Sequence, residues 1–111
     1  MKELRFRCWI SINEEKFFGP GPMQLLQLIE QEGSLSKAAK AMGMSYKKAW
    51  DLVNQLNEKS SKPMVISTKG GAKGGGAEIT PHGREIMAGY SALTRKIQSV
   101  ISANDSLLKL I

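Results

Sequence analysis

The first part of the chain alternates between apolar and other positions, which is typical of a β-strand. From residue 4 to residue 12, every second side chain is apolar, and those between are mostly charged or polar. A period of two with β-branched and aromatic residues predicts a strand over 4–12. Residues 13–16 predict a turn and 17–18 a short returning strand, so we expect the chain to open with a β-hairpin.

The period changes to that of a helix after the Gly-Pro-Gly-Pro run at 19–22. Pro22 suits the first position of a helix, where no amide donor is needed. Three leucines and one isoleucine between 25 and 29 form the apolar side. These features predict a helix from Pro22 to about Glu32, ended by Gly33.

Two short helices joined by a tight turn are predicted next, over 35–42 and 46–58. Ser34 and Ser45 each precede one of them and can cap it through the side-chain oxygen. Gly43 suits a left-handed helix end, and two adjacent alanines in the first helix allow a close crossing. Two helices that meet across a short glycine turn form a helix-turn-helix, and a basic one usually lies on DNA.

A basic glycine-rich loop follows, over 69–76, between predicted strands over 64–68 and 77–79. A hairpin of this kind directly after a helix-turn-helix is the layout of a wing. The loop does not fit a nucleotide-binding phosphate loop, because Lys73 is followed by glycines and a strand. A phosphate loop needs Gly-Lys-Ser/Thr at the start of a helix.

The last predicted helix runs over 81–103, with Thr80 as its cap and Pro81 in its first turn. Its apolar residues recur at steps of four and three, a heptad-like seam. We expect a subunit interface there, with the protomer's own core as the alternative, and we expect the apolar tail over 107–111 to pack on this chain or a partner. The seam consists of Ile86, Tyr90, Leu93, Ile97 and Val100.

The distribution of charge indicates a polyanionic partner. The chain carries 16 Lys and Arg against 10 Asp and Glu, a net charge of +6. Residues 34–84 hold nine of the positive and three of the negative side chains, so this stretch carries the whole excess. A local basic field favours capture of nucleic acid, although charge alone is also compatible with an ordinary solvated surface.

Composition excludes several other classes. The 111 residues suffice for one domain over 1–111, and a single cysteine excludes a disulfide framework or a cysteine-cluster zinc site. The absence of an apolar run of about 18 residues and of a signal core predicts a soluble cytoplasmic protein without a membrane partner. Cys8 is expected in the core and His82 as a solvated residue at a helix start. No nucleophile–base or carboxylate pair stands out, so we expect neither an enzyme nor a cofactor.

The polar face of the helix over 46–58 supplies the expected base contacts. Lys47, Asp51 and Asn54 point away from the core-facing stripe, and Asn suits adenine edges while Lys suits guanine edges or phosphates. Tyr46 is interpreted as a groove or phosphate contact. Trp50 is interpreted as buried support, with stacking on a backbone sugar as the alternative.

Phosphate contacts are expected around this helix. Serines and lysines near helix starts meet free amides and a favourable dipole, although plain capping explains the serines as well. Lysines of the wing fit phosphate contact or entry into the minor groove. Together with the base contacts, the expected DNA-binding residues are Ser36, Lys37, Ser45, Tyr46, Lys47, Lys48, Asp51, Asn54, Lys69 and Lys73.

Two segments resemble a known family. The run from Gly33 to Asp51, with Ser-Tyr-Lys-Lys-Ala-Trp at 45–50, and the glycine-rich segment 70–77 are similar to the DNA-binding domain of ModE, the molybdate-responsive regulators. A more distant likeness is to the winged helix of LysR-type regulators. The resemblance implies a dimeric winged-helix transcription regulator. Because the molybdate-binding domains of that family have no counterpart in this chain, we expect a stand-alone DNA-binding module without a molybdate site.

The expected fold is therefore α+β: a winged helix-turn-helix with an N-terminal β-hairpin and a long C-terminal dimerisation helix. The expected function is sequence-specific binding of double-stranded DNA by a homodimer that regulates transcription. A protein-interaction adaptor that uses the same scaffold is the alternative.

Overall fold

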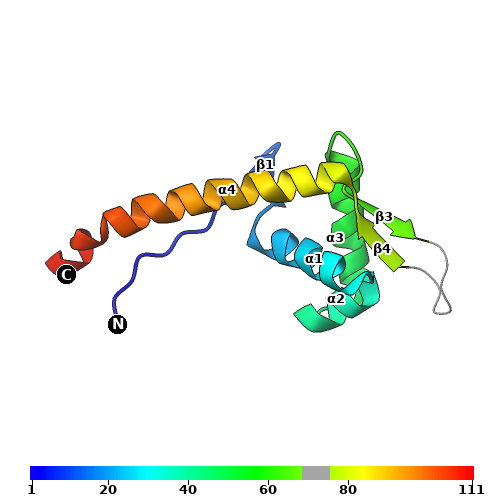
Figure 1. The fold of residues 1–111 in the computed structure, drawn as a ribbon, viewed down its shortest axis with the longest axis horizontal. Helices are drawn as coiled ribbons and strands as arrows, with labels where there is room; N and C mark the ends of the chain where they lie inside the picture. The colour runs from blue at the N-terminus through cyan, green and yellow to red at the C-terminus, as the bar shows by residue number, and fades with distance from the viewer. Residues whose placement is uncertain (69–75) are drawn as a thin grey trace.

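A computed structural model describes residues 1–68 and 76–111 and shows an α+β winged helix (Figure 1). Two antiparallel hairpins, β1–β2 and β3–β4, form separate two-stranded sheets. Three helices pack together beside the second hairpin, and a long fourth helix extends away from them. The elements are β1 (Ile10–Ile12), β2 (Glu15–Phe18), α1 (Pro20–Glu32), α2 (Leu35–Met42), α3 (Tyr46–Lys59), β3 (Val65–Thr68), β4 (Gly76–Ile79), α4 (Pro81–Ala103) and the 3₁₀ helix η1 (Asp105–Leu110).

Side-chain caps start three of the helices at the predicted residues. Ser34 Oγ accepts from the amide of Lys37 at 3.2 Å, and Ser45 Oγ accepts from the amide of Lys48 at 3.1 Å. Thr80 Oγ1 caps α4 in the same way. Each cap satisfies an amide that has no partner within its own helix, which fixes where the helix begins.

The core lies where α1, α2 and α3 meet β2 and the second hairpin. Phe18 of β2 and Leu25, Leu26 and Ile29 of α1 are fully buried, and Tyr90 of α4 packs against Phe18. The rings of Phe18 and Tyr90 pack edge to face with their centroids 5.2 Å apart. The Tyr90 hydroxyl donates to the Cys8 carbonyl oxygen at 2.8 Å. The buried apolar side chains are Phe18, Leu25, Leu26, Ile29, Ala38, Ala39, Ala49, Leu56, Met64, Val65, Ile79, Met87 and Tyr90.

The first strand of the N-terminal hairpin is shorter than predicted, whereas the second strand is longer and begins at Glu15, within the predicted turn. The strand predicted over 4–12 is wrong before Ile10, because its partner β2 ends at Phe18, opposite Ile10. The following Gly-Pro sequence starts a helix, so the residues before Ile10 have no strand to pair with. The helix α1 also begins two residues earlier than predicted, at Pro20 and not at Pro22. The amide of Met23 donates to the carbonyl of Gly19 at 3.0 Å, so the first turn already includes Pro20.

The predicted seam of α4 divides into two parts. Tyr90 is 7% exposed and Ile86 packs against the core cluster, so the protomer's own core, the alternative for this seam, uses these two side chains. Leu93 and Val100, farther along the helix, are 43% and 62% exposed. The reason is geometric: the first half of α4 lies over the domain, and its second half projects beyond it (Figure 1).

The C-terminal tail leaves most of its apolar residues exposed, and only Leu108 is partly buried. Leu107, Leu110 and Ile111 in and after η1 are all exposed. Among residues 1–68 and 76–111, no helix is long and apolar enough to cross a membrane.

Candidate nucleic-acid interface

The turn between α2 and α3 places the two helices as in a helix-turn-helix. Gly43 adopts a left-handed conformation at φ 70°, and its amide donates to the carbonyl of Lys40 at 3.1 Å. Ala38, Ala39 and Ala49 are buried, so small side chains allow the helices to approach closely. This geometry holds α3 against the core by one side and leaves its polar side in solvent.

The polar side of α3 carries two intrahelical contacts. Lys47 Nζ lies 3.3 Å from Asp51 Oδ2, and Asn54 Nδ2 donates to Glu58 Oε1 at 3.2 Å. Both are spaced four residues apart on an exposed surface, where such pairs contribute only about 0.3–0.5 kcal/mol. These side chains can therefore exchange their partners for base edges or phosphates at little cost.

The residues predicted for phosphate contact lie in the same region. Ser36 and Lys37 occupy the first turn of α2, and both are exposed. Ser45 and Lys48 lie at the start of α3 and are also exposed. The Ser45 oxygen accepts the capping bond from α3, which leaves the hydroxyl proton free to donate to an anion.

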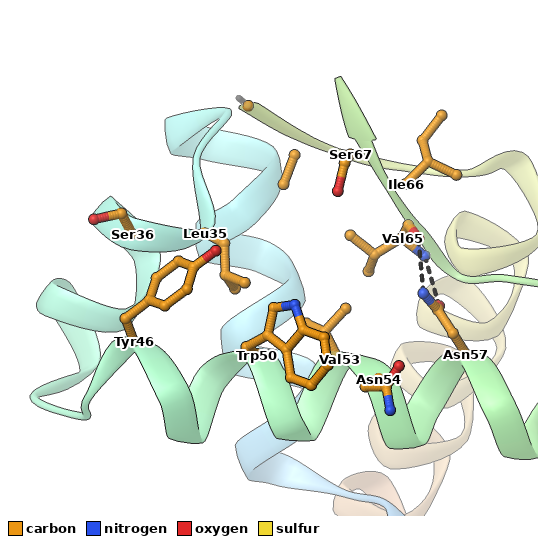
Figure 2. A pocket seen from close by; sticks show the side chains of 12 residues that line it. Leu35, Ser36, Tyr46, Trp50, Val53, Asn54, Asn57, Val65, Ile66 and Ser67 are labelled. Atoms are coloured by element: carbon orange, nitrogen blue, oxygen red, sulfur yellow. Dashed lines mark hydrogen bonds between the residues drawn. The ribbon is translucent and has the colours of Figure 1, made fainter. Parts of the chain in front are cut away.

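The interpretation of Trp50 as buried support is wrong. Trp50 is 49% exposed and Tyr46, one turn earlier, is 55% exposed. The arc of α3 that faces the core is filled by smaller residues, Ala49, Val53 and Leu56, which turns Trp50 to the flank. There it lines a groove of about 310 Å³ between α3 and the β3–β4 hairpin (Figure 2).

Asn57 joins α3 to the wing, a role that the sequence did not indicate. Its Oδ1 accepts from the amides of Met64 and Val65 at 2.8 and 3.1 Å. Its Nδ2 donates to the Val65 carbonyl at 2.9 Å, as Figure 2 shows. One side chain thus satisfies three backbone groups and sets the position of β3 relative to α3. A lone Asn beside an apolar stripe carries no signal that would have revealed this.

The described base of the wing is a regular hairpin. Val65 pairs with Ile79 and Thr68 with Gly76. The amide of Ala77 donates to the Gly33 carbonyl at 3.1 Å, which ties β4 to the end of α1. The predicted phosphate contacts Lys69 and Lys73 lie outside the described residues.

The lone cysteine and histidine have structural surroundings. Cys8 is partly buried against the core, as expected, although it precedes the strand. His82 was predicted to be solvated, but it is partly buried, and its Nε2 lies 2.9 Å from Ser60 Oγ. It thereby links the first turn of α4 to the end of α3. Within the described parts of the chain, no three His, Cys, Asp or Glu residues are grouped closely enough to hold a metal ion.

Known proteins share this sequence pattern. The family "Bacterial regulatory helix-turn-helix protein, lysR family" matches residues 22–84, which run from α1 into the start of α4. The chain is 43% identical over 79 residues to the molybdenum transport protein ModE of Azotobacter vinelandii, covering 71% of this chain and 29% of that protein. It is 36% identical over 101 residues to the DNA-binding transcriptional dual regulator ModE of Escherichia coli K12, covering 88% of this chain and 38% of that protein.

A third relative is the molybdenum-pterin-binding protein MopB of Rhodobacter capsulatus. It is 38% identical over 92 residues, covering 83% of this chain and 34% of MopB. The chain thus spans 29–38% of the length of these three curated relatives. The helix-turn-helix, the wing strands and the family match coincide on the same residues. The chain belongs to the LysR family of bacterial regulatory helix-turn-helix proteins.

Proposed function

We propose that this chain binds double-stranded DNA sequence-specifically and regulates transcription, with α3 in the major groove and the wing on the adjoining backbone. The observation that carries the proposal is the arrangement of α3. Its apolar side packs against the core, while Lys47 and Lys48 are exposed and Asn54 is partly exposed beside the groove. Such a helix is rigidly held and fits the width of a major groove. Such a regulator works on the chromosome, so we place it in the cytoplasm; its role is binding, without catalysis.

Charge supports DNA as the partner. Between residues 34 and 68 the chain carries six lysines and two acidic residues. Phosphate contacts from such lysines position a protein on the duplex, while base contacts specify the sequence. The proposed contact residues remain Ser36, Lys37, Ser45, Tyr46, Lys47, Lys48, Asp51, Asn54, Lys69 and Lys73.

We assign dimerisation to the projecting half of α4. Leu93, Ile97 and Val100 continue the heptad-like spacing beyond the part that the core uses. A two-fold dimer would present two α3 helices about 34 Å apart, one turn of DNA. Sedimentation equilibrium of the purified chain measures this directly, and a protomer mass at every concentration would contradict the dimer.

The salt dependence of binding tests the function. If six or more phosphates are neutralised, affinity for a duplex should fall by about a thousandfold or more between 50 and 200 mM salt. Gel shifts at both salt concentrations measure the affinity for a mixed-sequence duplex and for a site obtained by in vitro selection. Failure to bind duplexes even at low salt would instead favour the protein-interaction adaptor.

Asn54 gives the sharpest test of base reading. Asn54→Ala should weaken binding to the selected site by about 1–3 kcal/mol and leave binding to the mixed-sequence duplex nearly unchanged. The reason is that an Asn amide pairs with an adenine edge only at its own position. Gln55→Ala, next to it on another flank of α3, is the control. Equal discrimination by Asn54→Ala and the wild type would remove Asn54 from base reading.

A further inference from the structure

The groove between α3 and the β3–β4 hairpin adjoins the surface of α3 assigned to the major groove and shares Tyr46 and Asn54 with it (Figure 2). Its walls come from the first turn of α2, the flank of α3 and both wing strands. Tyr46 and Trp50 stand on α3 one helical turn apart, and Ser67 points toward them from β3. Asn57, which also lines the groove, is hydrogen-bonded to the backbone where this strand begins.

The lining combines aromatic surfaces with hydroxyl donors. Tyr46 and Trp50 stay half exposed, although either could bury far more apolar area in a core. Val53, Ser36 and Ser67 also line the groove; in Figure 2 the Ser67 hydroxyl points inward and the Ser36 hydroxyl points outward at the rim. A concentration of exposed aromatic surface with polar groups around it is typical of a binding surface. The ligand should therefore alternate apolar faces with hydrogen-bond acceptors.

One strand of duplex DNA has this alternation. When a helix lies in the major groove and a hairpin reaches past it, the part of the duplex between them is a sugar–phosphate backbone. Each deoxyribose presents an apolar C–H face, and each phosphate presents only acceptor oxygens. The excess of lysines in α2 and α3 supplies the complementary charge, and the groove is continuous with the proposed base-reading surface.

We infer that this groove seats the sugar–phosphate backbone of one DNA strand, with Trp50 packed on a deoxyribose and the Ser36 and Ser67 hydroxyls donating to the flanking phosphates. The inference rests on the proposed DNA binding and adds Trp50 and Ser67 to its sequence-independent contacts. Trp50 is then a positioning residue. It fixes how deeply α3 enters the major groove of the DNA, and it does not read a base.

The test compares Trp50→Ala and Trp50→Phe with the wild type on one mixed-sequence duplex. The duplex is prepared with thymine and again with uracil in its place, because thymine's methyl group is the apolar feature a base-reading tryptophan would contact. Trp50→Ala should weaken binding about tenfold on both duplexes, the loss of one packed aromatic anchor. Trp50→Phe should recover most of the affinity, and the slope of affinity against salt should not change, because no cation is removed.

Fluorescence gives a readout independent of affinity. The chain has two tryptophans, and Trp9 is not among the groove residues; the Lys16 ammonium lies over its ring. In Trp9→Phe, Trp50 is the only reporter, and its emission should change on addition of the duplex at saturation. Gln55→Ala, on another flank of α3, is the matched control and should bind like the wild type.

Each alternative outcome overturns the inference in a distinct way. Equal affinity of Trp50→Ala and the wild type, with unchanged Trp50 emission, places the strand elsewhere while DNA binding itself stands. A loss confined to the thymine duplex makes Trp50 a base reader. A wild-type chain that binds neither duplex overturns the proposed function together with this inference.

Discussion

Replacing Gly83 with alanine is expected to lower the free energy of unfolding by about 3 kcal/mol, although alanine is the better helix former. Gly83 is buried in the first turn of α4, where the helix crosses the wing. A β-carbon there would lie 2.4 Å from the Met64 carbonyl oxygen and 2.9 Å from Cγ2 of Ile79. The carbonyl cannot move away freely, because it accepts the amide of Thr80 at 3.0 Å. Either α4 or β3 must therefore shift.

Urea denaturation followed by circular dichroism measures this effect, and Gly89 provides the control in the same helix. A β-carbon on Gly89 would meet nothing within 4 Å. Gly89→Ala should therefore stabilise the chain by about 0.5–1 kcal/mol, the ordinary gain of alanine over glycine in a helix. Equal unfolding midpoints for the two variants would show that the approach of α4 to the wing is not a constraint.

Asn57→Ala is expected to destabilise the chain by about 3 kcal/mol, because it removes three hydrogen bonds to partly buried backbone groups. The amides of Met64 and Val65 and the carbonyl of Val65 would lose their common partner. Alanine is too short to replace any of these bonds, and the space it leaves lies beside the groove. Because β3 then loses its attachment to α3, affinity for a duplex should fall as well.

The matched control is Asn54→Ala, one turn earlier on the same helix. The Asn54 amide bonds only the exposed Glu58 carboxylate, so its removal should change stability by less than about 0.5 kcal/mol. The two variants should therefore separate cleanly: loss of Asn57 lowers stability, and loss of Asn54 lowers discrimination between DNA sequences. Similar unfolding midpoints for both would contradict the anchoring role of Asn57.

Local signals placed the starts of three helices accurately. The starts of α2, α3 and α4 depend on Ser34, Ser45 and Thr80, each of which bonds an amide only three residues away. The end of α2 depends on Gly43, which takes up a left-handed conformation. Such interactions are complete within a few residues, so the sequence alone reveals them.

Interactions between distant segments were the ones missed. The strand predicted over 4–12 lost its first part because the length of its partner, not its own pattern, limits pairing. Trp50 was misplaced because a helical period gives the angle of a side chain and not what lies beside it. The role of Asn57 depends on the backbone of residues 64–65, whose position is set by packing of the whole hairpin.

By itself, then, the sequence determined the order and type of the elements as far as α4, the helix-turn-helix with its wing, and the concentration of basic residues on that half of the chain. Capping, periodicity and charge act over short distances and are visible in the chain as written. Only the tertiary structure decided which residues of α4 the core uses, which aromatic side chains of α3 remain in solvent, and that a groove separates α3 from the wing. Those outcomes depend on how close distant segments come to each other, and that distance is set by packing the assembled core.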